Sequence, residues 1–279
     1  MKVVCWLYLL LGGSLAFGQV APYEVPLWSA GAPGFEHLKD EPTEAEDWWI
    51  KNIHNPSVTI YPADSNNATG VGVIVVPGGG HRALVFNSEG HDAAVYLQRL
   101  GITVFVLKYR LAREEGSLYS IEGHAAQDLE RAVRLMRYKA PQLGINAEKV
   151  GLLGFSAGGE LVSMVSYRPG DVKTDATDPI DQESSRPDFQ MLVYPGPLGV
   201  PEELPSSPPP LFVVAARNDE CCAPPSLRLL NLYFEAGYSV EAHIYAKGGH
   251  AFNMGYRTEY ITLKNWPARM SDWLRDNWF

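Results

Sequence analysis

The chain is poor in cysteine and in positive charge, and each shortage excludes a class of protein. Three cysteines in 279 residues are too few for a scaffold held together by disulfides. Lys and Arg total 23 against 32 Asp and Glu, and the formal charge of −9 opposes binding to nucleic acid and to anionic membranes. Apolar residues, by contrast, make up 46% of the chain. Disorder, collagen and coiled coil are therefore excluded, and the length fits one large α/β domain or two small ones.

The first residues have the pattern of an export signal. Lys2 precedes an apolar run from Val3 to Leu11, and the small-x-small site Ala16-Phe17-Gly18 follows. We predict that residues 1–18 are a cleaved signal peptide, that residues 19–279 form a single domain, and that the protein is secreted or periplasmic. A buried N-terminal helix or strand and a membrane anchor are the alternatives. The run is short for a spanning helix, so we expect no membrane span in the mature chain.

Cleavage would leave Cys221 and Cys222 as the only cysteines. Such neighbours can form a vicinal disulfide in an oxidising compartment, stay reduced, or pack as two small apolar residues. The sequence leaves all three states open.

Short runs rich in β-branched residues alternate with helical patterns, which predicts βαβ units in a mostly parallel sheet. The first run, 58–61, predicts an edge strand because Pro62 follows it. The other expected strands are 71–76, 103–107, 150–154, 191–194, 211–215 and 240–245. The expected helices are 92–99, 124–138, 157–167, 226–236 and 268–278. We interpret two polar loops, 168–188 and 196–210, as surface excursions that are too short and polar for a cap domain.

The segment Gly154-Phe155-Ser156-Ala157-Gly158 lies between a predicted buried strand and a predicted helix. In a turn of the G-x-S-x-G type, the serine is strained with its Oγ exposed, and the glycines allow neighbouring backbone to approach closely. We therefore predict that Ser156 is a catalytic nucleophile. The pattern is common by chance, so other segments must support it.

One supporting segment runs from Pro77 to His81 and ends an earlier strand. Hydrolases place there an N–H group that joins the N–H following the nucleophile in an oxyanion hole. We assign the oxyanion hole to Gly79, Gly80 and Ala157. Alone, the segment would equally suit a flexible turn.

Two further residues complete a triad in the chain order that this arrangement requires. Asp219 and His250 each follow a predicted strand, as Ser156 does. The other six histidines stand inside a strand, before helices, before the core sheet or beside the oxyanion segment. Glu220 competes with Asp219 as the acid, and we favour Asp219 because its shorter side chain follows the strand more closely.

Patterns for other chemistry are missing from the sequence. No HExxH or CxxC pattern supports a metal site. Gly78 to Gly80 lack the Lys-Ser/Thr of a phosphate-binding loop and the remaining glycines of a dinucleotide fingerprint. We therefore expect no metal and no cofactor. In the expected reaction, His250 takes the proton of Ser156 as Oγ attacks an ester carbonyl, and Asp219 holds the imidazole tautomer.

At these residues the chain resembles the α/β-hydrolases, and more narrowly the small secreted esterases described as acetyl xylan esterase-like. The resemblance implies an α/β-hydrolase fold, with a mostly parallel central sheet flanked by helices on both faces and no cap domain. It further implies a serine carboxylesterase that acts on acyl groups, above all acetyl, of carbohydrate such as xylan. The segments that carry it are Pro26 to Trp28, Ala32 to Gly34, Pro77 to His81, Glu89-Gly90, Leu107 to Leu111, Asp128, Arg131, Gly154 to Gly159, Asp219 and Gly248 to His250.

Two residues depart from the pattern of those esterases. His81 stands where Tyr or Trp is usual, and Glu160 stands where His is usual. We treat both as candidate substrate-binding residues, while Glu160 could equally complement a helix N-terminus. For Arg110 we favour a structural role over substrate binding.

Three functions remain open from the sequence. The first is the carbohydrate esterase, with an acylated carbohydrate or small ester as its partner and a feruloyl-type esterase as a variant. The second is a serine peptidase of prolyl-oligopeptidase type, which shares the triad order but usually carries a large accessory domain. The third is a non-catalytic binding protein on a hydrolase scaffold. The acyl group, the sugar and the oligomeric state stay undetermined.

Overall fold

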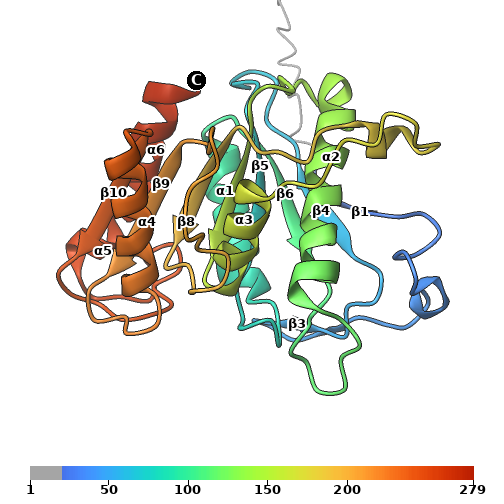
Figure 1. Cartoon of the computed structure of the whole chain (residues 1–279), viewed down its shortest axis with the longest axis horizontal. Coiled ribbons are helices and arrows are strands. Elements are labelled where there is room, and N and C mark those ends of the chain that lie inside the picture. Colours follow the sequence, from blue (N-terminus) through green and yellow to red (C-terminus); the bar gives the residue numbers. More distant parts are fainter. Residues whose placement is uncertain (1–20) are drawn as a thin grey trace, which may run out of the picture.

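The computed structural model describes residues 21–279, so the predicted signal peptide lies outside the described residues. An eight-stranded sheet crosses the molecule in the order β1-β4-β6-β5-β7-β8-β9-β10 (Figure 1). Its strands, in chain order, are β1 (Tyr23–Pro26), β4 (Ser57–Tyr61), β5 (Gly72–Val76), β6 (Thr103–Lys108), β7 (Val150–Phe155), β8 (Phe189–Val193), β9 (Leu211–Ala216) and β10 (Val240–Tyr245). From β6 to β10 all neighbours are parallel, whereas β4 is antiparallel to both β1 and β6.

Helices cover both faces of this sheet. Those on one face are α2 (Ala126–Leu143), α3 (Ala157–Tyr167) and α4 (Ala223–Ala236), and those on the other are α1 (Asp92–Arg99), α5 (Ile261–Lys264) and α6 (Trp266–Asn277) (Figure 1). Short helical turns at Glu36–Leu38, Phe86–His91, Ile121–Ala125 and Pro179–Gln182 and a two-stranded sheet of β2 (Glu44–Ala45) and β3 (Ile50–Lys51) complete the described elements. The predicted α/β-hydrolase fold, with a mostly parallel sheet between two helical layers, is confirmed.

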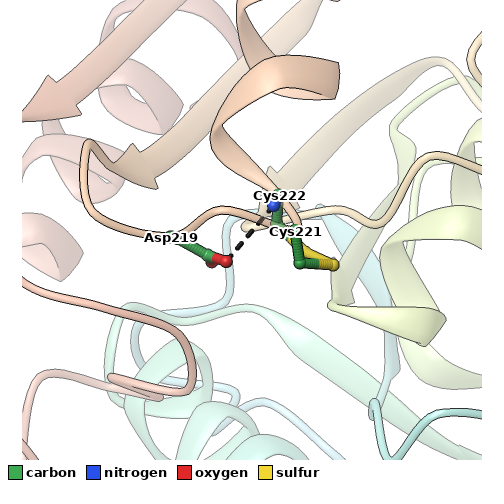
Figure 2. Close-up of side chains that lie close together, drawn as sticks. All are labelled: Asp219, Cys221 and Cys222. Carbon is green, nitrogen blue, oxygen red and sulfur yellow. Dashed lines mark hydrogen bonds between the residues drawn. A yellow bond between two sulfur atoms is a disulfide. The ribbon is translucent and has the colours of Figure 1, made fainter.

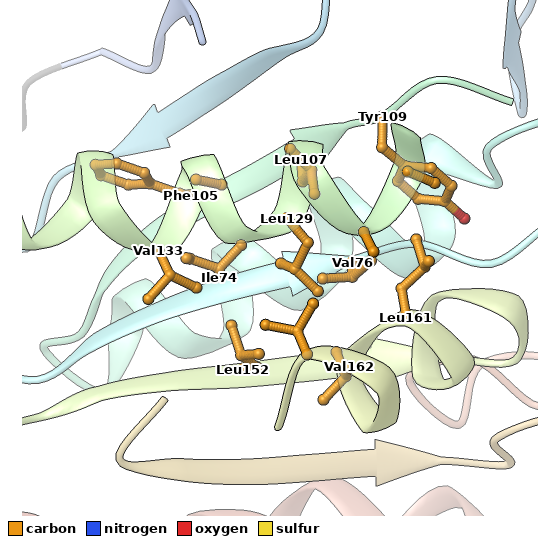
Figure 3. Packing of buried hydrophobic residues seen from close by; sticks show 14 of the residues in the cluster. Ile74, Val76, Phe105, Leu107, Tyr109, Leu129, Val133, Leu152, Leu161 and Val162 are labelled. Atoms are coloured by element: carbon orange, nitrogen blue, oxygen red, sulfur yellow. The ribbon is translucent and has the colours of Figure 1, made fainter. Parts of the chain in front are cut away.

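The central strands are apolar on both faces because helices cover both. In β5, Ile74 and Val76 pack toward α2 and α3, where Leu129 and Leu161 meet them (Figure 3). Val73 and Val75, which alternate with them, belong to the opposite core with α1 and α6. All five residues of β5 are buried. This unbroken apolar composition holds the C-terminal ends of the parallel strands, where the candidate site lies, in a rigid layer.

One prediction about the sheet was wrong. The strand at 58–61 is not at an edge, because β1 pairs with β4 on its outer side, from Tyr23 opposite Ile60 to Pro26 opposite Ser57. Strand β1 ends at a proline and carries mostly exposed residues, so it lacks the apolar pattern by which the inner strands were recognised. Of the two polar loops, 168–188 contains a short helical turn at Pro179–Gln182 that contacts α2.

Arg110 lies in the interior and has a structural role, as favoured from the sequence. Its guanidinium and backbone N–H donate to the carboxylate of Asp128, 2.6 Å away at the closest approach, and both side chains are fully buried. The Trp28 and Phe35 rings lie 5.7 and 5.9 Å from the guanidinium carbon and cover it. This pair attaches the N-terminal segment to the sheet.

Within residues 21–279, no helix combines the length and the hydropathy needed to cross a membrane.

Candidate active site

Ser156 occupies a tight turn between β7 and α3. Its backbone adopts φ +49°, ψ −118°, a conformation that is unfavourable for a residue with a side chain, and its N–H group donates to the carbonyl of Val193 at 3.0 Å. The turn requires glycine two residues later, because a Cβ on Gly158 would lie 2.0 Å from the carbonyl oxygen of Val76. The local sequence thus folds into the strand–turn–helix context in which a G-x-S-x-G serine is exposed for attack.

A chain of hydrogen bonds connects Ser156 to two side chains from other strands. The Ser156 hydroxyl lies 2.9 Å from Nε2 of His250, and Nδ1 of the same imidazole lies 2.7 Å from Oδ2 of Asp219. The Asp219 side chain is only 2% exposed, whereas His250 is 38% exposed. The serine donates, the imidazole accepts, and the buried carboxylate holds the other nitrogen, which is the arrangement that activates a serine hydroxyl.

Asp219 is held by a second contact on its other oxygen. Oδ1 accepts the backbone N–H of Cys222 at 3.2 Å, at the start of α4 (Figure 2). Cys222 is joined to Cys221 in a vicinal disulfide, one of the three states that the sequence left open. The competing acid Glu220 is exposed, and its side chain takes no part in the hydrogen bonds to His250. Both oxygens of Asp219 are therefore used within the site.

The glycine segment, Gly78 to Gly80 after β5, lies against the candidate nucleophile. A Cβ placed on Gly78 would be 2.9 Å from Cβ of Ser156. Gly79 and Gly80 both have positive φ, +129° and +66°, which glycine adopts without strain. Within residues 21–279, neither of their N–H groups donates to another backbone group. Together with the N–H of Ala157 at the free start of α3, they are available to a developing oxyanion.

Glu89, which the sequence did not single out, binds the backbone of the glycine segment. Its Oε2 accepts the N–H of Gly78 at 2.7 Å, and its Oε1 accepts the hydroxyl of Tyr194 at 2.8 Å. The Tyr194 ring packs against His250 with ring centroids 4.8 Å apart. Burial raises the pKa of Glu89, although these two hydrogen bonds oppose the shift. Glu89 was visible in the sequence only as part of the resemblance.

His81 and Glu160 differ from what the sequence suggested. Both are candidate substrate-binding residues from the sequence, with a helix N-terminus as the alternative role of Glu160, but His81 is fully buried and Glu160 nearly so. Their side chains bind each other instead, with Nε2 of His81 2.8 Å from Oε2 of Glu160. The pair leaves little surface for a ligand, and within the described residues Nδ1 of His81 is buried without a hydrogen-bond partner.

A cavity of about 340 Å³ opens beside the imidazole of His250. Gly248, Phe252, Arg257 and Tyr260 are among the residues that line it. Of the three residues in the hydrogen-bond chain, only His250 lines this cavity.

The described residues contain one group of side chains with metal-ligand atoms close together, formed by Asp219, Cys221 and Cys222. It does not fit a metal ion. Both carboxylate oxygens of Asp219 accept hydrogen bonds, and the sulfurs share a disulfide, whereas metal binding requires thiolates.

A mostly parallel sheet with a serine turn after β7, an acid after β9 and a histidine after β10 defines the α/β-hydrolases. This chain has the α/β-hydrolase fold, and its residues 58–194 match the model of the BD-FAE family. The matched region includes the glycine segment, Ser156 and Glu160, while Asp219 and His250 lie beyond it.

Known proteins similar to this chain include esterases. Acetylxylan esterase from Xylanibacter ruminicola is 35% identical over 130 residues, which are 46% of this chain and 23% of that protein. Endo-1,4-beta-xylanase B from Butyrivibrio fibrisolvens is 32% identical over 123 residues, 44% of this chain and 19% of that protein. The chain therefore matches less than a quarter of the length of these curated relatives.

Among solved structures, the acetyl ester-xyloside bifunctional hydrolase from Caldicellulosiruptor lactoaceticus superposes with a TM-score of 0.73 at 26% identity, covering 91% of this chain and 96% of that one. The carboxylesterase Cest-2923 from Lactobacillus plantarum has a TM-score of 0.66 at 19% identity, with 84% and 97% covered. The second likeness concerns the fold alone.

Proposed function

We propose that the protein is a secreted serine carboxylesterase that removes acyl groups, above all acetyl, from carbohydrate such as xylan. The observation that carries the proposal is the continuous hydrogen-bond chain from Ser156 through His250 to Asp219, beside the available N–H groups of Gly79 and Gly80. Within residues 21–279, no other serine hydroxyl lies against an imidazole whose second nitrogen binds a carboxylate.

In the first half of the proposed reaction, Ser156 Oγ attacks the ester carbonyl while Nε2 of His250 takes the hydroxyl proton. The carboxylate of Asp219 stabilises the imidazolium and keeps its Nδ1–H pointing inward. The carbonyl oxygen becomes an oxyanion and accepts N–H groups from Ala157 and from Gly79 or Gly80, each contributing about 3 kcal/mol to the transition state. Collapse of this intermediate expels the sugar oxygen, which His250 protonates.

In the second half, water replaces the sugar. His250 takes a proton from the water as its oxygen attacks the acyl-enzyme carbonyl, and the same N–H groups hold the second oxyanion. Collapse then releases the carboxylic acid and returns the proton to Ser156. The exposed face of His250 allows both the sugar hydroxyl to leave and water to enter.

The proposed substrate class rests on the named relatives. One is an acetylxylan esterase, one a xylanase, and the superposed bifunctional hydrolase acts on acetyl esters and xylosides by its name. The formal charge of −9 is compatible with a neutral polysaccharide and opposes a strongly anionic one. Export through residues 1–18 would bring the enzyme to such a substrate outside the cell.

The test measures acetate release from acetylated xylan and from simple sugar acetates, compared with cleavage of a long-chain ester, a feruloylated sugar and aminoacyl-proline peptides. We expect the acetylated carbohydrates to give the highest kcat/KM. A strong preference for the long-chain ester or for the peptides would contradict the proposal.

The control is Ser156→Ala, for which we expect loss of activity by roughly 10⁵- to 10⁶-fold with the fold retained. A fluorophosphonate probe should label the wild-type serine and leave Ser156→Ala unlabelled. Failure to label the wild type would favour a binding protein on a hydrolase scaffold. N-terminal sequencing of the exported protein checks cleavage after Gly18.

A further inference from the structure

A buried polar pair lies beside the candidate site and has no part in the mechanism above. Nε2 of His81 donates to Oε2 of Glu160 at 2.8 Å, and the two side chains are 0% and 7% exposed. Burying two ionisable groups carries a desolvation cost that an apolar pair would avoid, so the pair adds little net stability on its own account. Its location indicates what it does instead.

Glu160 connects three segments of the site. It lies on the first turn of α3, and its own N–H donates to the carbonyl of Ser156 at 3.1 Å. While Oε2 binds His81, Oε1 accepts the N–H of Leu198 at 3.1 Å, from the loop after β8. The backbone closes in on this carboxylate, because a Cβ on Gly196 would lie 2.1 Å from Oε1. Glu160 is thus held from both sides.

His81 connects the same pair to the glycine segment. It directly follows Gly80 and has φ +60°, a conformation that His adopts more readily than most residues with a side chain. Its carbonyl accepts the N–H of Arg113 at 2.9 Å, and its ring packs edge-on against Tyr109 at a centroid distance of 6.2 Å. Because His81 is fixed by its backbone and its ring, it limits the rotation of the peptide groups that precede it.

We propose that His81 and Glu160 are positioning residues, which lock the glycine segment onto the nucleophile helix and so hold the oxyanion N–H groups at the correct distance from Ser156. The inference rests on the proposed serine-esterase function, because it concerns the same oxyanion. The Gly79 and Gly80 peptides have no side chains to restrain them. The Gly79 carbonyl accepts the N–H groups of Arg82 and Ala83 at 3.1 and 3.3 Å, and side-chain anchors hold the segment on either side, namely Glu89 at Gly78 and Glu160 at His81.

The experiment compares His81→Asn, Glu160→Gln, Glu160→Ala and the double variant His81→Asn/Glu160→Gln. Asn tolerates the positive φ but is too short to reach Glu160. Gln keeps an oxygen for the Leu198 N–H and loses the charge, so it is the milder change and the variant with the better prospect of folding. The activity substrate is 4-nitrophenyl acetate, which needs no carbohydrate subsite.

We expect kcat to fall roughly 10- to 100-fold in His81→Asn and Glu160→Ala, and less in Glu160→Gln, with KM within about twofold of wild type. A lower kcat at constant KM is what we expect when the N–H groups that stabilise the transition state are misplaced. Because the two residues act through one contact, the double variant should be no worse than its more damaging single variant.

A second readout does not depend on activity. Amide hydrogen exchange of the segment 77–85, followed by mass spectrometry, should accelerate in every variant that breaks the pair. The matched control is Tyr233→Phe, which removes the buried contacts of the Tyr233 hydroxyl with Gln190 and with the Pro209 carbonyl, both at 2.8 Å, at the start of β8 and away from the strand ends that carry the site. It should lower the unfolding temperature and leave kcat and the exchange of 77–85 unchanged.

Three results would overturn the inference: folded variants with wild-type kcat and wild-type exchange, a rise in KM at constant kcat, which would mean substrate contact, or additive losses in the double variant. If the wild type hydrolyses no ester and Ser156 resists labelling, the proposed function fails by itself. The exchange measurement still decides then whether the pair locks the segment.

Discussion

Asp128 and Asp219 are two buried aspartates that bind basic side chains, yet they belong to different parts of the molecule. Asp128 binds Arg110 with both side chains fully buried, under the rings of Trp28 and Phe35. Asp219 binds His250, whose side chain is 38% exposed and whose second nitrogen lies next to the serine hydroxyl. A buried carboxylate serves chemistry only when its partner still has an atom facing the substrate. Arg110 has none, so its pair serves the fold.

If the two aspartates differ in this way, substitution of Asp219 should remove activity and substitution of Asp128 should remove stability. The largest effect is expected at Asp219. Asp219→Asn should lower kcat roughly 10³- to 10⁴-fold, because the amide no longer selects the imidazole tautomer that accepts the serine proton. The measurement is steady-state hydrolysis of 4-nitrophenyl acetate, with the unfolding temperature as the check on the fold. Glu220→Gln, one residue later and exposed, is the matched control and should keep wild-type kcat. Equal losses in both variants would contradict the assignment.

At Asp128 we expect the opposite result, a loss of stability with activity retained. Asp128→Asn leaves the Arg110 guanidinium buried without its counter-charge and should lower the free energy of unfolding by about 3–5 kcal/mol. The kcat of the folded fraction should stay near the wild-type value, because the pair does not touch the reacting atoms. Urea unfolding gives the first quantity and an activity titration with a fluorophosphonate the second. A variant of normal stability would show that the pair does not hold the N-terminal segment.

Glu89 combines features of both aspartates, because it is buried, like Asp128, and also binds a segment of the candidate site, like Asp219. Burial raises its pKa above the ordinary 4.5. A raised pKa in the folded state means that the stability it contributes is full below pH 4.5 and is lost as the pH rises through the folded-state pKa. Glu89→Gln removes this dependence. The wild type should therefore gain stability relative to the variant on acidification, measured by urea unfolding at a series of pH values; parallel curves would refute the shift.

The smallest effect is expected at the disulfide. Cys222 supports Asp219 through its backbone N–H, which serine at this position would keep. The double variant Cys221→Ser/Cys222→Ser should therefore change kcat by less than about threefold, since a surviving backbone hydrogen bond retains its geometric role. Wild-type enzyme treated with a dithiol is the companion sample. If kcat instead collapsed in both samples, the disulfide itself, and not the backbone, would hold the acid in place.

The sheet and its helices were largely predictable because their patterns are local. The helices at 92–99 and 157–167 and the strand at 240–245 have the predicted bounds, since their apolar spacing is set by neighbouring residues. Strand β1 was missed because an exposed edge strand of four residues has no such spacing. The pairing that holds it depends on β4, more than thirty residues away.

The sequence by itself determined the elbow around Ser156, because a strand, a tight turn with Gly158 and a helix form one continuous segment, and it ordered the candidate acid and base along the chain. Only the tertiary structure decided which side chains meet. The contact of His250 with Asp219 spans 31 residues and that of His81 with Glu160 spans 79. Burial decided as well, because the sequence allows His81 and Glu160 to contact substrate, whereas in the folded chain both are buried and bind each other. Distances of this kind are set when the whole core packs, and no local pattern records them.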